Sequence, residues 1–91
     1  MKKKRNKLEI IYDLLLAVRK SNSAISITHL IRRSNLSPQS FKEYYYELIS
    51  KEFIEEIFNE NDKKYISITD RGRKYIHEYK VIIDFIEEFE L

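Results

Sequence analysis

Residues 65–76, YISITDRGRKYI, hold the pattern that decides the fold. Over residues 65–69 aliphatic side chains alternate with more polar ones, which is typical of a half-buried β-strand. Thr69 is a good helix N-cap, and Asp70 complements the positive end of a helix dipole. The strand therefore runs directly into a helix. Gly72, the single glycine of the chain, falls in the first helical turn, where a missing side chain allows close packing on the sheet or on another helix.

The remaining elements are predicted from caps and from hydrophobic periodicity. Helices are expected at 7–20, 27–33, 38–51 and from 70 to about 90, with N-caps at Asn6, Ser26, Ser37 and Thr69. Residues 25–26 form a very short strand, and residues 53–58 pair with 65–69 as a β-hairpin whose polar tip is NENDKK. The fold class is therefore mainly α with a small β-hairpin (α+β), and the segment 53–58 is the one whose alternation is irregular.

The first predicted helix has apolar residues on two sides. One stripe contains Leu8, Ile11, Leu15 and Val18, and the other contains Ile10, Leu14 and Ala17. A helix that is apolar on two sides is covered on two sides, so we expect this helix at the centre of the domain.

Composition limits the classes of function. A chain of 91 residues forms one domain, and 43% apolar with 35% charged residues is typical of a globular protein. The absence of cysteine excludes disulfides and thiolate metal sites. His29 and His77 lack the spacing of a zinc site, and no glycine-rich loop cradles phosphates, so we expect no enzyme, metal or cofactor. No small-molecule site, secretion signal or membrane span is evident, and we expect a cytoplasmic protein.

Charge is unevenly distributed along the chain. Residues 1–50 hold 10 Lys/Arg and 4 Asp/Glu, a net charge of +6, whereas residues 51–91 hold 7 and 11, a net charge of −4. Such a division indicates that one end meets a polyanion, although a charge run is also the ordinary composition of a solvated face.

Two segments together resemble the winged helix-turn-helix fold. NLSPQSFKEYYYELISKEFIEE (35–56) resembles the family's turn, recognition helix and first wing strand, and YISITDRGRKYI resembles its second wing strand running into the closing helix. One departure concerns Glu52, which stands where the family usually has a glycine that ends the helix in a left-handed conformation. A non-glycine residue in that conformation costs about 1 kcal/mol. The helix can instead end differently or run on, so the sequence leaves the angle of the wing open.

The C-terminal helix adds a narrower resemblance, to small archaeal winged-helix DNA-binding proteins that dimerise through an antiparallel coiled coil. Apolar residues that step by 4, 3, 4 and 3, as in a heptad seam, are Tyr75, Tyr79, Ile82, Ile86 and Phe89. These five and Ile83, which lies beside the seam, are the expected dimer contacts. Phe85 widens the seam. Alternatively the seam folds back on the first helix. We expect a basic arm at 1–6, a winged helix-turn-helix domain at 7–69 and a dimerisation helix at 70–91.

The resemblance implies a DNA-binding surface on the third helix. With Phe41, Tyr45 and Leu48 turned inward, the residues left for the major groove are Gln39, Ser40, Lys42, Glu43 and Tyr46, with Tyr44 at the boundary. Gln39 can bond an adenine edge in bidentate fashion.

Phosphate contacts are expected from basic residues around that helix. The candidates are Lys2, Lys3, Lys4 and Arg5 in the arm, Arg32 and Arg33 at the end of the second helix, and Lys63 and Lys64 in the wing at about 59–64. The arginine pair can instead complement the C-terminus of its own helix. Glu60 and Asp62 weaken the attraction of the wing to DNA.

Two functions from different classes fit these observations. The first is sequence-specific or architectural binding of double-stranded DNA by a homodimeric transcriptional regulator associated with the nucleoid. The second is a winged helix used only for protein–protein contact, with the acidic C-terminal half as its working surface. The fold does not decide between them.

Overall fold

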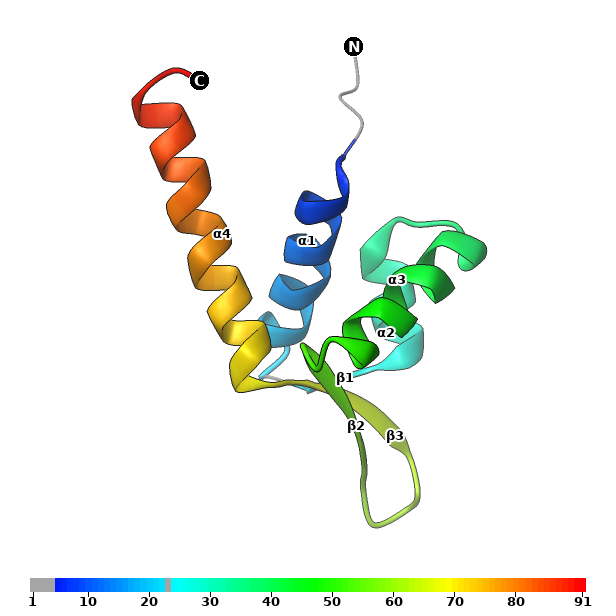
Figure 1. Cartoon of the computed structure of the whole chain (residues 1–91). Helices are drawn as coiled ribbons and strands as arrows, with labels where there is room; N and C mark the ends of the chain where they lie inside the picture. The colour runs from blue at the N-terminus through cyan, green and yellow to red at the C-terminus, as the bar shows by residue number, and fades with distance from the viewer. Residues whose placement is uncertain (1–4, 23) are drawn as a thin grey trace.

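The computed structural model describes residues 5–22 and 24–91, which form four helices and a small sheet (Figure 1). The elements in chain order are α1 (Lys7–Lys20), β1 (Ala24–Ser26), α2 (Ile27–Ser34), α3 (Pro38–Ser50), β2 (Ile54–Phe58), β3 (Lys64–Ile68) and α4 (Asp70–Glu88). The predicted order and the mainly α, α+β class are confirmed. The last helix ends two residues before the predicted end.

The sheet contains three antiparallel strands in the order β1-β3-β2. β3 lies in the middle, so Ile66 is flanked by Ile25 of β1 and by Glu56 of β2. β2 and β3 form a hairpin that projects beyond the helices at the bottom of Figure 1. At its tip the side chain of Asn59 accepts backbone N–H bonds of 2.8 Å from Asn61 and 2.9 Å from Lys63, which fixes the turn.

Each helix begins at the predicted cap. The side chains of Asn6, Ser26, Ser37 and Thr69 accept hydrogen bonds from the backbone N–H three residues later. Pro38 occupies the first turn of α3, where its missing N–H leaves no helical bond unmade. These local signals explain why the helix starts can be read from the sequence.

The turn after α3 keeps the left-handed conformation although it lacks glycine. Glu52 has a φ of 60°. The N–H of Phe53 bonds the carbonyl of Leu48 at 3.0 Å, and the N–H of Glu52 bonds that of Ile49 at 3.0 Å, which is a Schellman motif. The helix therefore ends in the left-handed turn of the family pattern, with Glu52 in place of the glycine.

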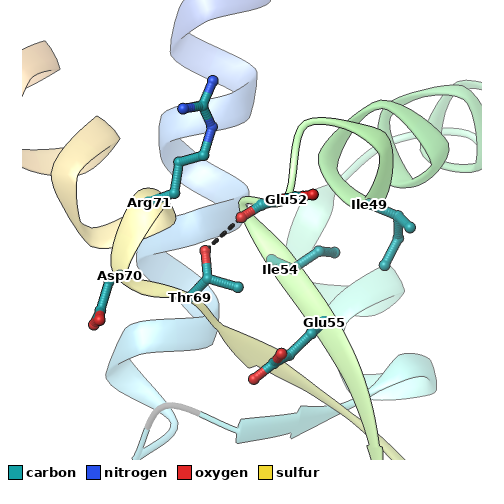
Figure 2. Close-up of a pocket in the computed structure, with 7 residues that line it drawn as sticks. All are labelled: Ile49, Glu52, Ile54, Glu55, Thr69, Asp70 and Arg71. Carbon is teal, nitrogen blue, oxygen red and sulfur yellow. Dashed lines mark hydrogen bonds between the residues drawn. The ribbon is translucent and has the colours of Figure 1, made fainter.

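The start of α4 is bonded to this same turn (Figure 2). The hydroxyl of Thr69 donates to the carbonyl of Glu52 at 2.6 Å, and its N–H donates to the carbonyl of Phe53 at 3.1 Å. The Nε of Arg71 donates to the carbonyl of Lys51 at 2.9 Å, and its guanidinium carbon lies 5.5 Å from the centre of the Phe53 ring. The abrupt strand-to-helix passage of residues 65–76 thus ties the closing helix to the end of α3.

α1 lies at the centre of the core, as predicted. Its buried residues pack with α2, α3, the sheet and the start of α4, and they are Ile10, Ile11, Leu14, Leu15, Ala17 and Val18. The assignment of Leu8 to a buried stripe is wrong, since its side chain is 55% exposed. Leu8 lies in the first turn of α1, and the buried part of this helix begins only at Ile10.

Candidate nucleic-acid interface

α3 has one buried face and one polar face. Phe41 and Leu48 are buried, and the ring of Tyr45 stacks on that of Phe41 with centroids 5.8 Å apart. On the opposite face the exposed residues are Gln39, Lys42, Glu43 and Tyr46, whereas Ser40 is half-buried. The predicted division of this helix into inward and outward residues therefore matches its burial except at Ser40.

Tyr44 and Tyr46 lie on different sides of α3. Tyr46 is 62% exposed, whereas Tyr44 is half-buried against the core. Tyr44 lines a shallow hollow with Glu43, Glu47 and Lys7, whose ammonium group lies 2.8 Å from the Glu47 carboxylate. The pair raises the pKa of Lys7, chiefly through the hydrogen bond. Because Tyr44 packs against the core and Tyr46 is exposed, the two rings form no common surface on which the bases of a single strand could stack.

Two of the predicted basic contacts are turned toward α1. Arg33 is exposed but lines a hollow with Asp13 and Lys20 of α1. Arg5 donates to the Asp13 carboxylate at 3.0 Å and to the carbonyl of Ser34 at 2.8 Å. It therefore links the segment before α1 to the end of α2. Arg32 is exposed. Lys2, Lys3 and Lys4 lie outside the described residues.

The wing contributes a charged cluster beside α3. Lys63 is exposed, and the ammonium group of Lys64 lies 3.1 Å from the carboxylate of Glu56. The same carboxylate oxygen accepts a hydrogen bond from the hydroxyl of Tyr45. Burial, and then this bond, raise the pKa of Tyr45, whereas the bonds from Tyr45 and Lys64 lower the pKa of Glu56. This three-residue bridge fixes the hairpin against α3.

A groove of about 370 Å³ lies between α2, α3 and the hairpin. Apolar, charged and phenolic side chains line it, and these residues are Ile27, Ile31, Pro38, Phe41, Lys42, Tyr45, Tyr46, Glu56 and Lys64. The polar face of α3 and the hairpin therefore border one continuous hollow.

The predicted seam of α4 divides into two parts. The hydroxyl of Tyr75 donates to the carbonyl of Leu8 at 2.7 Å, and the ring of Tyr79 stacks on that of Tyr12 with centroids 4.6 Å apart. These two tyrosines pack on α1, as the folded-back alternative expected. Farther along, Ile83 is half-buried, and the exposed apolar residues are Val81, Ile82, Phe85, Ile86, Phe89 and Leu91.

The winged helix-turn-helix family model matches residues 4–87. The chain belongs to the winged helix-turn-helix family. It is also similar in structure to Sso10a-2, a DNA-binding protein from Sulfolobus solfataricus: the TM-score is 0.75 at 22% identity, over 94% of this chain and 86% of that chain. This likeness supports the same fold. No curated protein matches the chain.

In winged-helix terms α2 and α3 are the helix-turn-helix, and β2 with β3 is the wing. The turn between the two helices is made by Asn35, which has a left-handed φ of 56°, and by the hydroxyl of Ser34, which accepts the N–H of Leu36 at 3.1 Å. Because Ser34 also donates to the carbonyl of Ile31 at 2.6 Å, its buried hydroxyl is fully bonded.

Glu56 is the residue of this winged helix that sequence reasoning missed. In the sequence it stands out only as half of an acidic pair on a solvated strand. Its face could not be assigned because residues 53–58 do not alternate cleanly. In the observed register Glu56 lies diagonal to Lys64, which is within reach of a long side chain, whereas the prediction placed Lys64 in the tip of the hairpin.

The described residues of this winged-helix chain are 5–22 and 24–91. They contain no group of three or more His, Cys, Asp or Glu side chains placed to hold a metal ion. Among the helices of that same part of the chain, none is long and apolar enough to span a membrane. His29 and His77 are both exposed.

Proposed function

We propose that this winged-helix protein binds double-stranded DNA, with the polar face of α3 in the major groove. The observation that carries the proposal is the open face formed by Gln39, Lys42, Glu43 and Tyr46, which borders the groove beside the wing. A major groove about 12 Å wide admits a helix of this kind. The structural likeness to Sso10a-2, a DNA-binding protein, adds support.

Base contacts are proposed from the first half of α3. The amide of Gln39 lies 3.4 Å from the carboxylate of Glu43, so the two side chains point along the same exposed edge. Gln39 would bond an adenine edge and Glu43 the amino group of a cytosine, because these are the pairings that their groups permit. Ser40 and the hydroxyl of Tyr46 supply further donors.

Phosphate contacts are proposed from Lys42, Lys63 and Arg32, which are exposed, and from Lys3 and Lys4 of the arm. Arg5 is proposed to stabilise the fold instead, because its guanidinium is held by Asp13 and by the end of α2. Arg33 is left as a weaker candidate because it faces α1. Phosphate contacts supply most of the affinity of such complexes and make it salt-dependent.

The exposed half of α4 is proposed to pair with a second copy of the chain. Ile82, Phe85, Ile86 and Phe89 form an apolar face longer than a monomer needs to expose. The charges favour an antiparallel arrangement. Residues 70–80 carry four Lys/Arg and two Asp/Glu, a net charge of +2, whereas residues 81–91 carry four Asp/Glu and no Lys/Arg, a net charge of −4. The resulting homodimer would act as a transcriptional regulator or nucleoid protein.

A second candidate is a protein–protein interaction module, and the exposure and charge of the wing favour it. Phe58 is 63% exposed, and the carboxylates of Glu60 and Asp62 at the tip of the wing repel phosphate. This candidate predicts that duplex DNA does not bind at any salt concentration.

Fluorescence anisotropy with a labelled random-sequence duplex separates the two candidates. DNA binding predicts an affinity that falls steeply between about 50 and 200 mM salt, since each neutralised phosphate contributes about −0.9 to the logarithmic salt slope. No binding at the low-salt end would reject the proposed function.

A further inference from the structure

The groove between α3 and the wing contains its own carboxylate. Glu56 lies among the groove-lining residues, and its oxygen takes hydrogen bonds from the ammonium group of Lys64, at 3.1 Å, and from the hydroxyl of Tyr45. The other two donors that line the groove and could hold a phosphate are Lys42 and the hydroxyl of Tyr46. Two of the four donors are therefore already bonded to an anion of the protein itself.

Strand geometry separates Glu56 from its neighbour Glu55. Successive side chains of a strand point to opposite faces. Glu56 faces α3, whereas Glu55 lines a different hollow with Asp70 and Arg71, at the start of α4 (Figure 2). The two carboxylates have the same charge and adjacent positions, but one of them lies in the groove.

A duplex bound through α3 brings a phosphodiester strand to this groove. One DNA strand lies along the edge of the DNA major groove. It has to pass between α3, which lies inside that major groove, and the β2–β3 hairpin beside it. This step rests on the proposed function. The phosphates of that strand need cationic and hydroxyl donors. The groove offers Lys42, Tyr46, Lys64 and Tyr45, and Glu56 is bonded to the last two.

We propose that Glu56 is an internal competitor of DNA phosphate that holds Lys64 and Tyr45 in the free protein and lowers the affinity for duplex DNA. Its carboxylate occupies the donors that a phosphate would use, and it places a negative charge beside the passing strand. Lys64 is then largely neutralised before DNA arrives. Lys63, which is exposed at the wing, lacks this restraint in the described interactions.

The test compares Glu56→Gln with the matched control Glu55→Gln in salt-dependent anisotropy with duplex DNA. Each variant removes one negative charge from the same strand, and the amide oxygen that Glu56→Gln introduces still accepts the bond from Tyr45. We expect Glu56→Gln to bind about three- to tenfold more tightly at about 50 mM salt and to steepen the salt slope by about one phosphate. Glu55→Gln is expected to change the affinity less than about twofold.

A second comparison measures Lys64→Gln in the wild type and in Glu56→Gln, because Lys64→Gln alone also leaves the Glu56 carboxylate unpaired. Lys64→Gln should weaken binding more in the Glu56→Gln background, where the ammonium group is free to meet a phosphate. Equal effects of Glu56→Gln and Glu55→Gln, or an effect of Lys64→Gln that is the same in both backgrounds, would overturn the inference while leaving DNA binding intact. A wild-type protein that does not bind duplex DNA would overturn both.

Discussion

The Cα atom of Gly72 faces the backbone carbonyl of Phe53 at the point where α4 meets the turn after α3. A Cβ atom at position 72 would lie 2.3 Å from the carbonyl oxygen of Phe53 and 2.8 Å from Cγ1 of Ile68. The first contact is with backbone, which cannot rotate away. The single glycine of the chain therefore serves close approach, and its own φ is not positive.

Gly72→Ala should destabilise the domain although alanine favours helices. The gain in helix propensity is about 1 kcal/mol, and the clash with Phe53 exceeds it, so we expect a net loss of about 2 kcal/mol or more. Urea unfolding followed by circular dichroism measures this loss. Lys74→Ala, an exposed change one half-turn later, is the control, and an equally stable Gly72→Ala would show that the turn can move away.

Glu52→Gly should stabilise the domain. Glu52 holds a φ of 60°, which costs a residue with a side chain about 1 kcal/mol relative to glycine. Part of this gain is lost to the greater freedom of glycine in the unfolded chain, so the expected increase in unfolding free energy is about 0.5 kcal/mol. Lys51→Gly, at a residue with a φ of −89°, should lower the stability in the same assay. A Glu52→Gly variant that is less stable than wild type would show that the backbone at Glu52 is not strained.

Tyr75 should make the stability fall at alkaline pH. Burial, followed by the charges of Tyr79 and Glu47, raises the pKa of Tyr75 from 10.0 to about 12. A raised folded-state pKa gives stability that is complete below pH 10 and is lost as the pH rises through about 12. When urea unfolding is measured from about pH 9 to pH 12, the difference in unfolding free energy between wild type and Tyr75→Phe should become smaller. A stability difference that stays constant over this range would contradict the shift.

Lys42→Gln should weaken duplex binding through the loss of one phosphate contact. We expect the logarithmic salt slope to become shallower by about 0.9, with little dependence on DNA sequence. Lys80→Gln is the matched control, because Lys80 is on α4 and pairs with Asp84 at 3.2 Å. An unchanged slope for Lys42→Gln would remove this lysine from the interface.

Ile82→Glu should convert the proposed homodimer into a folded monomer. Ile82 is exposed on the seam of α4, so a charge there opposes pairing and leaves the core of the chain untouched. Sedimentation velocity measures the mass. Val81→Glu changes the adjacent exposed residue off the seam and should remain dimeric. A wild-type monomer at high concentration would reject pairing through α4.

The fold was predictable because its signals are local. The four caps and Pro38 set the helix starts, and clean alternation over residues 65–69 defined β3. The side-chain directions of β2 were not predictable, since only Ile54 of that strand is buried and no apolar alternation marks its faces. The end of α3 was predicted within one residue, but the conformation of the turn after it could not be read from sequence, because Glu52 takes a left-handed conformation that its side chain disfavours.

The candidate site was predictable to the extent that it follows one helix. Burial of Phe41 and Leu48 determines which residues of α3 remain outside. The partners of Arg5 and Glu56 were not predictable, because each contacts an element distant in sequence. Tyr75 and Tyr79 fitted a heptad seam, but their contacts with α1 depend on the crossing of two helices, which periodicity alone does not give.

Backbone amide chemical shifts during titration with a short duplex test the central claim most directly, which is that α3 enters DNA with its polar face. The predicted result is that the amides of Gln39, Ser40, Lys42 and Tyr46 shift most, that those of the wing lysines follow, and that the end of α4 stays unchanged. Unmoved α3 amides in the presence of saturating duplex, or shifts confined to α4, would contradict the account.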